Sequence, residues 1–261
     1  MLSIDLNNKV AIVTGSTQGI GLGVAKVLAD AGCNIAGCGL SDSSSDKVLN
    51  FIKEIEERGR KAMYMRVDVK DQTSINAFIN SVVDQLGRID ILISNAGRNM
   101  FTNPAACDET FWDDNMDLNL KSHWLMSKAC YPQLCENKGT VLLMTSNHAY
   151  ATLPDCFPYN VSKAGITGMV KALAVQWGPK VRVVGLAPGF IQTEGGDKWF
   201  ESFPDPMKKR QEVENIHLVQ KLGDVGEVGA FCAFLCSEFA GFITGTTYLM
   251  DGGRSAIMQD V

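Results

Sequence analysis

The stretch KVAIVTGSTQGIGLGVAKVLADAG, residues 9–32, decides the fold. Its first part, Val10–Thr14, is a short apolar run that predicts a strand buried on both faces. After a glycine-rich turn, apolar side chains recur at helical spacing over residues 19–31 and predict a helix. A strand that leads through such a turn into a helix is typical of the first unit of a doubly wound sheet.

Strands and helices keep alternating along the rest of the chain. The pattern predicts further strands at 34–38, 63–67, 89–94, 141–145, 181–186 and 246–250, with helices at 47–58, 74–86, 110–135, 159–178 and 227–237. Such alternation implies parallel strand pairing, right-handed crossovers and helices on both faces. We therefore expect an α/β fold, a Rossmann-type doubly wound parallel sheet, in a single domain that spans residues 1–261.

One segment, at about residues 191–222, breaks this rhythm. It is polar but rich in aromatic residues, including Trp199, and it contains two prolines. We expect two short helices that form a small lid over the substrate, because long insertions at the ligand-binding edge are usually functional. A surface excursion without function is the alternative.

Composition excludes several classes of partner. The net charge is −5 and no basic run of five residues occurs, so neither nucleic acid nor an anionic membrane is an expected partner. The sequence shows no signal peptide and no apolar run of transmembrane length. Eight scattered cysteines indicate reduced thiols in a cytoplasmic protein, and three separated histidines predict no metal site.

The glycine-rich turn has the spacing of a phosphate-binding loop. Glycines stand at Gly15, Gly19 and Gly21, so the backbone can turn sharply and come close to a pyrophosphate at the helix N-terminus. The spacing G-x-x-x-G-x-G differs from the usual dinucleotide fingerprint. Two further positions follow predicted strands: Asp68 could accept a hydrogen bond from an adenine amine, and the small residues of Asn95-Ala96-Gly97 leave room for adenosine.

The chain resembles the short-chain dehydrogenase/reductase family from about Lys9 to Gly253. The matching motifs, in the family's order, are the loop at 14–21, Asp68, Asn95-Ala96-Gly97, Asn119, Ser146, Tyr159-x-x-x-Lys163, Pro188-Gly189 with Thr193, and Asp251-Gly252-Gly253. One departure is Ser94, where the family usually has asparagine. The resemblance implies an enzyme that transfers a hydride between a nicotinamide cofactor and a secondary alcohol or ketone.

The resemblance also implies which residues form the site. The implied catalytic residues are Asn119, Ser146, Tyr159 and Lys163, with Asn119 holding a water that links Lys163 to solvent. The implied cofactor-binding residues are Gly15, Thr17, Gln18, Gly19, Ile20, Gly21, Leu40, Asp68, Val69, Asn95, Ala96, Gly97, Tyr159, Lys163, Pro188, Gly189, Ile191 and Thr193. Family members of this size are usually homotetramers, and the helices at 110–135 and 159–178 resemble their dimer helices.

The chemistry needs a group that exchanges a proton at the substrate oxygen. Tyr159 and Lys163 are four residues apart on a predicted helix and so share one face. A free phenol, with a pKa of about 10, is a poor base at neutral pH. We expect the nearby ammonium and the positive nicotinamide ring to lower that pKa. Ser146 can hold the substrate oxygen beside the phenol.

The end of the second strand predicts NAD as the cofactor, with NADP less favoured. NADP users of the family often carry arginine at the position of Leu40 or a basic residue in the glycine loop, and neither is present. A 2′-phosphate would then lack a cationic partner. Asp42 would repel it further if it folds back. The aspartate of many NAD users is also missing, since this chain has Gly39 there.

Four residues are candidates for substrate contact in addition to Ser146: Arg98, Asn99, His148 and Trp199. The loop at 14–23 and His148 resemble bacterial 3-hydroxybutyrate dehydrogenases, but the lysine of that subgroup is replaced by Cys156. The polar set suits a sugar or polyol equally well. We rank a sugar or polyol first, a 3-hydroxy acid second, and a steroid or other hydrophobic ketone third.

Two other classes remain as alternatives. A non-catalytic dinucleotide-binding regulator could share this fold, but it need not keep all four catalytic residues. An NADP-dependent carbonyl or 3-oxoacyl reductase would act on a carrier-bound chain. That reductase is expected to have a basic docking surface, whereas the sequence pI is about 5.3.

Overall fold

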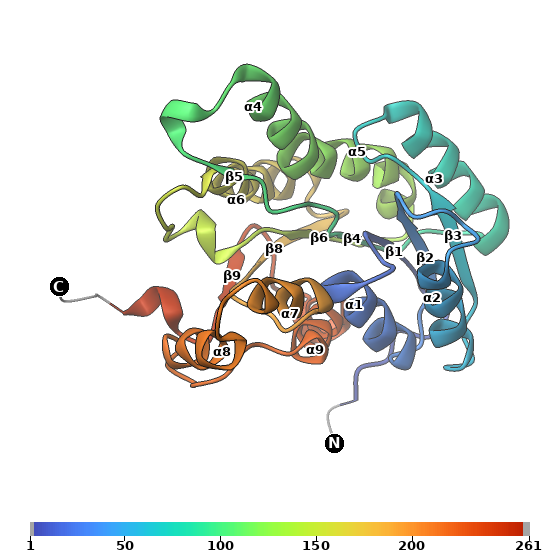
Figure 1. Ribbon diagram of the computed structural model, residues 1–261. Helices are drawn as coiled ribbons and strands as arrows, with labels where there is room; N and C mark the ends of the chain where they lie inside the picture. Colours follow the sequence, from blue (N-terminus) through green and yellow to red (C-terminus); the bar gives the residue numbers. More distant parts are fainter. Residues whose placement is uncertain (1–2, 258–261) are drawn as a thin grey trace.

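The computed structural model describes residues 3–257, and all of them belong to a three-layered α/β fold (Figure 1). Seven parallel strands form the central sheet in the order β3-β2-β1-β4-β6-β8-β9. Their bounds are β1 Val10–Thr14, β2 Asn34–Gly39, β3 Ala62–Arg66, β4 Ile91–Ser94, β6 Thr140–Met144, β8 Arg182–Pro188 and β9 Thr247–Met250. The predicted doubly wound parallel sheet is confirmed. The predicted domain also includes residues 1–2 and 258–261, which lie outside the described part.

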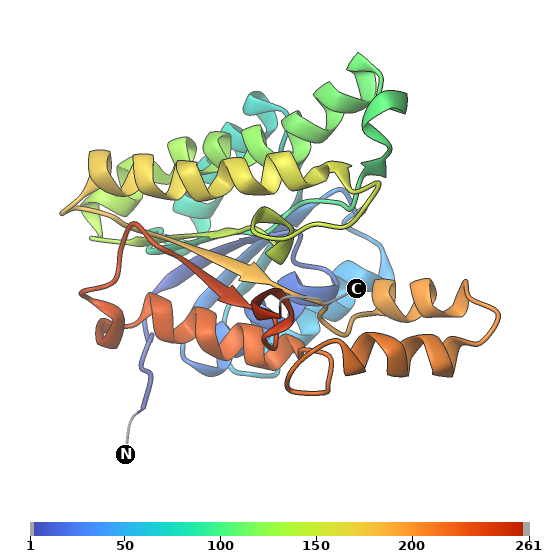
Figure 2. The same ribbon diagram turned by 90° about the vertical axis from the view of Figure 1, so that its left-hand side faces the viewer.

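Helices cover both faces of the sheet (Figure 2). One face carries α1 (Gly19–Asp30), α2 (Asp46–Glu56) and α9 (Val225–Cys236), and the other carries α3 (Gln72–Leu86), α5 (Ser122–Glu136) and α6 (Tyr159–Trp177). Each face has its own apolar core, because both sides of every central strand are buried. The helices and strands begin and end within two residues of the predicted positions, except the long helix at 110–135.

The strand order reverses direction between β1 and β4. β1 pairs with β2 on one side and with β4 on the other. At such a switch point the two following loops diverge and leave a crevice at the carboxyl ends of the strands. The glycine-rich loop after β1 and the segment after β4 therefore face each other across the predicted ligand edge.

The helix predicted at 110–135 is built from three consecutive pieces. The first is α4 (Glu109–Met116), the second is a π-helical segment, η2 (Asp117–Lys121), and the third is α5. A π-helical turn inserts an extra residue and is often found at functional sites. It changes which side chains face the sheet, and the apolar pattern alone does not reveal it.

A second, two-stranded sheet was not expected from the sequence. β5 (Phe101–Thr102) pairs antiparallel with β7 (Phe157–Pro158). This short ladder joins the segment after β4 to the residues just before α6. Strands of two residues are too short to show an alternating pattern.

The insertion at 191–222 contains two helices, as the sequence predicted: α7 (Glu194–Glu201) and α8 (Pro206–Asn215). A parallel bridge between Ile191 and Gly223 closes its base. The insertion has its own small apolar core of Phe200, Val213 and Leu222. Figure 2 shows both helices at the carboxyl end of the sheet.

Among residues 3–257, no helix combines the length and the apolar character needed to cross a bilayer. All eight cysteines lie in this range and are free thiols.

Candidate active site

Tyr159 and Lys163 lie on one face of α6, as predicted from their spacing. Tyr159 is the first residue of the helix, and the Lys163 Nζ atom is 5.5 Å from the centroid of the Tyr159 ring. Both side chains are buried. Ser146 follows β6 and is also buried, and it interacts with the phenol of Tyr159. The three residues therefore meet at the carboxyl end of β6.

Lys163 has hydrogen bonds to the end of β6 through both its side chain and its backbone. The ammonium donates a hydrogen bond to the Met144 carbonyl at 3.2 Å, and the Thr145 hydroxyl donates one to the Lys163 carbonyl at 2.6 Å. No carboxylate in the described range lies within ion-pair distance of the ammonium. Burial without a counter-charge lowers the pKa of Lys163 to about 7.

The pKa of Tyr159 moves in the direction opposite to the sequence-based expectation. Burial raises it to about 12, although the hydrogen bond with Ser146 acts to lower it. We expected the Lys163 ammonium to lower this pKa, and that expectation is wrong for the protein alone. The physical reason is that both groups are desolvated, so the lysine loses much of its charge near neutral pH.

Asn119 forms two hydrogen bonds with the backbone of the loop after β4. Its amide donates to the Arg98 carbonyl at 3.0 Å, and the Arg98 N–H donates to its amide oxygen at 2.9 Å. Gly97 fits between two catalytic candidates, because a Cβ there would lie 2.8 Å from the Asn119 oxygen and 3.5 Å from the Lys163 ammonium. The π-helical segment thus places Asn119 next to Lys163. The water-mediated relay through Asn119 stays a prediction.

Sequence reasoning missed a buried pair one turn further along. His123 on α5 forms a 2.8 Å hydrogen bond through Nδ1 with the hydroxyl of Ser94, the residue that departs from the family pattern. Burial first, and the charge of Lys163 second, hold the pKa of His123 well below its usual range. The imidazole is therefore neutral. Ser94 and His123 fasten α5 to the end of β4, and the departure at Ser94 was the available clue.

The glycine-rich loop has the shape that a pyrophosphate requires. Gly15 and Gly19 have positive φ angles of 66° and 54°, which side chains rarely adopt. A Cβ on Gly21 would lie 2.1 Å from the Gly15 carbonyl oxygen, so only glycine fits there. The backbone can therefore come close to a ligand at the N-terminus of α1. These residues fit a bound dinucleotide.

Thr14 links the glycine-rich loop to the segment after β4 by hydrogen bonds. Its hydroxyl accepts hydrogen bonds from the Asn95 and Ala96 N–H groups at 2.9 and 2.8 Å, and the Asn95 amide donates to its carbonyl at 3.0 Å. The predicted adenosine-side residues Asp68 and Val69 follow β3. Asp68 accepts from the Lys70 N–H at 2.9 Å. The ends of β1, β3 and β4 thus border the same edge.

The other end of the predicted cofactor path begins at β8. Pro188 is its last residue, and a Cβ on Gly189 would lie only 2.7 Å from the Asp251 side chain. Ile191 is buried, and the Thr193 hydroxyl caps α7 by accepting from the Gly196 N–H at 3.2 Å. A Cβ on Gly19 would lie 3.4 Å from the Thr193 methyl group. The glycine-rich loop and the start of α7 therefore lie close together.

The region after β2 carries the carboxylate of Asp42 and the ammonium of Lys47, of which the sequence reading considered only the first. The Asp42 carboxylate accepts hydrogen bonds from the Ser44 N–H and hydroxyl at 3.0 and 2.7 Å. Thr17 contacts Ser41 at 3.4 Å, while the Lys47 ammonium donates to the Gln18 amide oxygen. Leu40 and Ile20 complete this edge, and Leu40 is 65% exposed.

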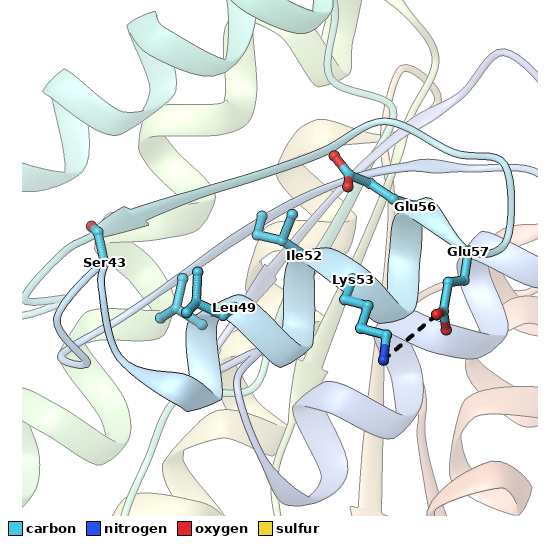
Figure 3. Close-up of a pocket in the computed structure, with 7 residues that line it drawn as sticks. Ser43, Leu49, Ile52, Lys53, Glu56 and Glu57 are labelled. Atoms are coloured by element: carbon cyan, nitrogen blue, oxygen red, sulfur yellow. Dashed lines mark ion pairs between the residues drawn. The ribbon is translucent and has the colours of Figure 1, made fainter.

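An apolar pocket of about 470 Å³ lies beside this region, on the outer surface of α2 (Figure 3). Leu49 and Ile52 line it, with the Lys53–Glu57 ion pair at its edge. None of the catalytic candidates contributes to it. This pocket is therefore separate from the site at the carboxyl end of β6.

The substrate candidates differ in where the structure places them. The His148 ring centroid is 5.9 Å from that of Tyr159 and 5.9 Å from that of Phe101, which sequence reasoning missed. Phe101 meets Tyr159 edge-on at 5.2 Å. Asn99 is exposed on the loop after β4, and the Arg98 guanidinium lies 3.5 Å from Asp114. Their roles toward the substrate stay predictions.

Trp199 lies in the insertion rather than beside the phenol. Its ring packs against those of Phe190, Phe200 and Phe203, with centroids 4.9–5.5 Å apart, and the residue is 42% exposed. Among the described aromatic contacts, none joins it to His148 or Tyr159. Its role in substrate contact stays a prediction.

A doubly wound sheet with a glycine-rich loop after β1 and a buried serine, tyrosine and lysine after β6 defines a dinucleotide-dependent oxidoreductase. Comparison with known proteins agrees: the family model described as "Enoyl-(Acyl carrier protein) reductase" matches residues 15–255. The chain belongs to the short-chain dehydrogenase/reductase family. It is an oxidoreductase of the kind that acts on CH–OH groups.

Three similar proteins illustrate the range of the family. The oxidoreductase UcpA of Salmonella typhimurium is 34% identical over 255 residues, which cover 96% of this chain and 95% of that protein. Dehydrogenase/reductase SDR family member 4 of Sus scrofa is 34% identical, with 96% and 88% covered. The ligand-free structure of Thermoplasma acidophilum aldohexose dehydrogenase has a TM-score of 0.89 at 27% identity, with 100% and 99% covered.

Proposed function

We propose that this protein is an NAD-dependent dehydrogenase that oxidises a secondary alcohol of a sugar or polyol, or reduces the corresponding ketone. The observation that carries the proposal is the meeting of Ser146, Tyr159 and Lys163 at the carboxyl end of β6, directly beside the polar ring of His148. Neighbouring polar groups suit a substrate with several hydroxyls. The aldohexose dehydrogenase among the similar structures supports this substrate class.

Each catalytic residue has a distinct task in this reaction. Ser146 holds the substrate oxygen by a hydrogen bond, and Tyr159 exchanges a proton with that oxygen. Lys163 lies one helical turn from the phenol and would hold the ribose of the cofactor. NAD, when bound, would supply the hydride acceptor and a positive ring charge that favours the phenolate. Burial by itself leaves Tyr159 protonated at neutral pH.

The preference for NAD rests on the end of β2. Gly39 and Leu40 offer no cation to a 2′-phosphate, and the loop at 15–21 contains none. Lys47 is nearby, but its ammonium is already bonded to Gln18. We therefore expect a clear preference for NAD, and Lys47→Gln should leave the ratio of NAD to NADP activity almost unchanged.

The test is a substrate screen followed by NADH absorbance. Sugars, polyols, 3-hydroxy acids and steroid alcohols are each offered with NAD and with NADP. We expect turnover of at least one sugar or polyol, and faster initial rates with NAD. Turnover restricted to other classes would remove the substrate assignment, and a clear NADP preference would remove the cofactor assignment.

A regulator without catalytic activity is separated from an enzyme by a single variant. Tyr159→Phe should abolish turnover while NADH still binds. If the wild-type protein binds NADH but reduces or oxidises nothing in the screen, the regulator becomes the better proposal. A preference for acyl thioesters with NADPH would instead favour a carbonyl or 3-oxoacyl reductase.

We also propose a cytoplasmic homotetramer. Exposed apolar side chains on the outer helices support it: Trp124 on α5, and Val161 and Val175 on α6. A second exposed group, Phe242 and Leu249, lies near and on β9. Light scattering should give a mass of four chains, and Val175→Glu should reduce it. A monomer at micromolar concentration would contradict the assignment.

A further inference from the structure

The carboxyl ends of three neighbouring strands meet beside the phenol. β8 pairs with β6 on one side and with β9 on the other. Ser146 follows β6, and the turn Asp251–Arg254 follows β9. The hydroxyl of Tyr150, in the segment after Ser146, donates to the Thr247 carbonyl at 3.5 Å. The turn after β9 therefore lies at the same edge of the sheet as Ser146, two strands away, and Figure 2 shows it at the carboxyl end of the sheet.

Hydrogen bonds within that turn hold the backbone of Arg254. The Asp251 carboxylate accepts from the N–H groups of Gly253 at 3.0 Å and Ser255 at 2.8 Å, and its carbonyl accepts from the Arg254 N–H at 3.1 Å. Asp251 is buried, and Gly253 has a φ of 81°. These hydrogen bonds thus fix the backbone of the turn, and with it the direction in which the Arg254 side chain leaves the turn.

The Arg254 side chain is half-buried and carries a charge without an ion-pair partner among residues 3–257. The charge of Asp251 stabilises the guanidinium, but the Asp251 carboxylate is not within ion-pair distance of it and accepts two backbone hydrogen bonds within the turn. Burying a cation costs free energy unless an anion or several acceptors compensate it. Such a guanidinium is a suitable partner for an anionic ligand.

Two neighbours of Arg254 are also neighbours of Tyr159. Burial lowers the pKa of His148, and the Arg254 charge lowers it further. Burial raises the pKa of Cys156, while the Arg254 charge acts in the opposite direction. His148 packs 5.9 Å from the Tyr159 ring, and Cys156 precedes Tyr159 by three residues. Arg254 is therefore within electrostatic range of two residues next to the phenol, and its turn lies at the same edge of the sheet as Ser146.

Arg98, the other arginine near the site, already has an ion-pair partner. Its guanidinium lies 3.5 Å from the Asp114 carboxylate, and its side chain is 66% exposed. Lys163 donates a hydrogen bond to the Met144 carbonyl at 3.2 Å. Arg254 is thus the best-placed cation for a charged group at the end of a substrate whose hydroxyl is held by Ser146.

We propose that Arg254 binds a carboxylate of the substrate, so that the enzyme selects hydroxy acids or polyhydroxy acids over neutral alcohols. The proposal rests on the dehydrogenase activity proposed above and shifts its substrate class from neutral sugars and polyols to acids, either sugar acids or the second-ranked 3-hydroxy acids. His148 then donates or accepts a neutral hydrogen bond at the same end of the substrate.

The test compares substrates that differ only in charge: 3-hydroxybutyrate with 3-hydroxybutyramide, and D-gluconate with D-glucitol. We expect kcat/KM with NAD to favour the acid by about 10- to 100-fold in at least one pair, as for a charge-assisted hydrogen bond. Arg254→Gln should remove this preference mainly through KM, and Arg254→Lys should keep part of it. Arg60→Gln removes one positive charge at the amino end of the sheet and should leave the preference unchanged.

A binding measurement covers the case in which none of these compounds is turned over. Malonate and malonamide are titrated into the enzyme–NADH complex and followed by NADH fluorescence. Tighter binding of malonate that disappears in Arg254→Gln supports the proposal, provided that the variant still binds NADH with wild-type affinity. Equal binding of the two compounds overturns it.

Two results separate this inference from the proposed function. Oxidation of neutral members as fast as acidic ones, or loss of the preference in Arg98→Gln but not in Arg254→Gln, overturns the role of Arg254 and leaves the dehydrogenase intact. Failure of the wild-type protein to bind NADH, or to use any alcohol, overturns the proposed function itself.

Discussion

The buried part of the site, which we call its floor, and the exposed part, which we call its rim, are built differently. On the floor, Thr14, Asn119 and Lys163 each have side-chain hydrogen bonds to backbone groups of another element, and all three are buried. On the rim, Asn99 and Trp199 are exposed and have no such bonds to the floor among the described contacts. Rigid elements thus hold the catalytic candidates, whereas loops and the insertion carry the candidates for substrate contact.

The sharpest way to break this comparison is to remove the proton-exchanging group of the floor. Tyr159→Phe deletes one hydroxyl and keeps the ring that packs against Phe101 and His148. We expect kcat to fall by about 10² to 10⁴, the usual contribution of general acid–base catalysis. The affinity for NADH, measured by fluorescence titration, should stay within about threefold. A variant with more than a tenth of the wild-type kcat would contradict the proposed mechanism.

The second prediction concerns stability and pH. Lys163 has a pKa of about 7 when folded and 10.5 as its ordinary value, so the unfolded chain binds more protons between these values. The free energy of unfolding should therefore rise with pH from about 7 to about 10.5. Lys163→Met should be inactive, yet more stable than wild type at pH 7 by a few kcal/mol.

Urea unfolding of both proteins between pH 7 and 9.5 checks this prediction. The upper limit avoids Tyr159, whose raised pKa makes its own contribution fall only between about 10 and about 12. We expect a smaller slope of stability against pH for the variant. Equal slopes would mean that the lysine is charged in the folded protein at pH 9.

A pair of glycines compares floor and rim directly. On the floor, Gly97→Ala would place a Cβ 2.8 Å from the Asn119 oxygen, and overpacking of this kind costs about 1–3 kcal/mol. In α7, Gly195→Ala meets nothing closer than 3.8 Å and should stabilise the protein by about 0.4–1 kcal/mol. Thermal unfolding and NADH titration of both variants should show losses only for Gly97→Ala.

The smallest effect is expected on the rim. Trp199→Ala removes a half-exposed ring from the aromatic cluster of the insertion. We expect KM for the substrate to rise by less than about tenfold, or about 1.4 kcal/mol, with kcat and NADH affinity unchanged. A loss of kcat as large as that of Tyr159→Phe would show that the insertion completes the catalytic floor.

Local patterns in the sequence predicted much of the floor. Apolar runs with helical or strand spacing depend on neighbouring residues, so the order of strands and the position of the glycine-rich loop could be read directly. The spacing of Tyr159 and Lys163 follows from helical geometry in the same way. The four catalytic candidates were identified by resemblance, and the structure brings them together.

Prediction from the sequence failed for properties that depend on burial or on contacts between distant segments. It predicted a lowered pKa for Tyr159, but the extent of desolvation depends on every element packed around the phenol. It did not find the β5–β7 ladder, which brings Phe101 to the phenol, or the link between Ser94 and His123. These contacts join residues 29 to 58 positions apart and leave no periodic pattern in the sequence.

By itself, the sequence determined the α/β class and predicted the cofactor edge and the candidate catalytic residues, because each depends on spacing within one helix, strand or turn. Only the tertiary structure decided which charged side chains are paired: within residues 3–257, Arg98 has Asp114 as an ion-pair partner, whereas Arg254 has none. The physical reason is that burial and ion pairing are properties of the packed molecule, set by segments that meet only after the sheet has formed.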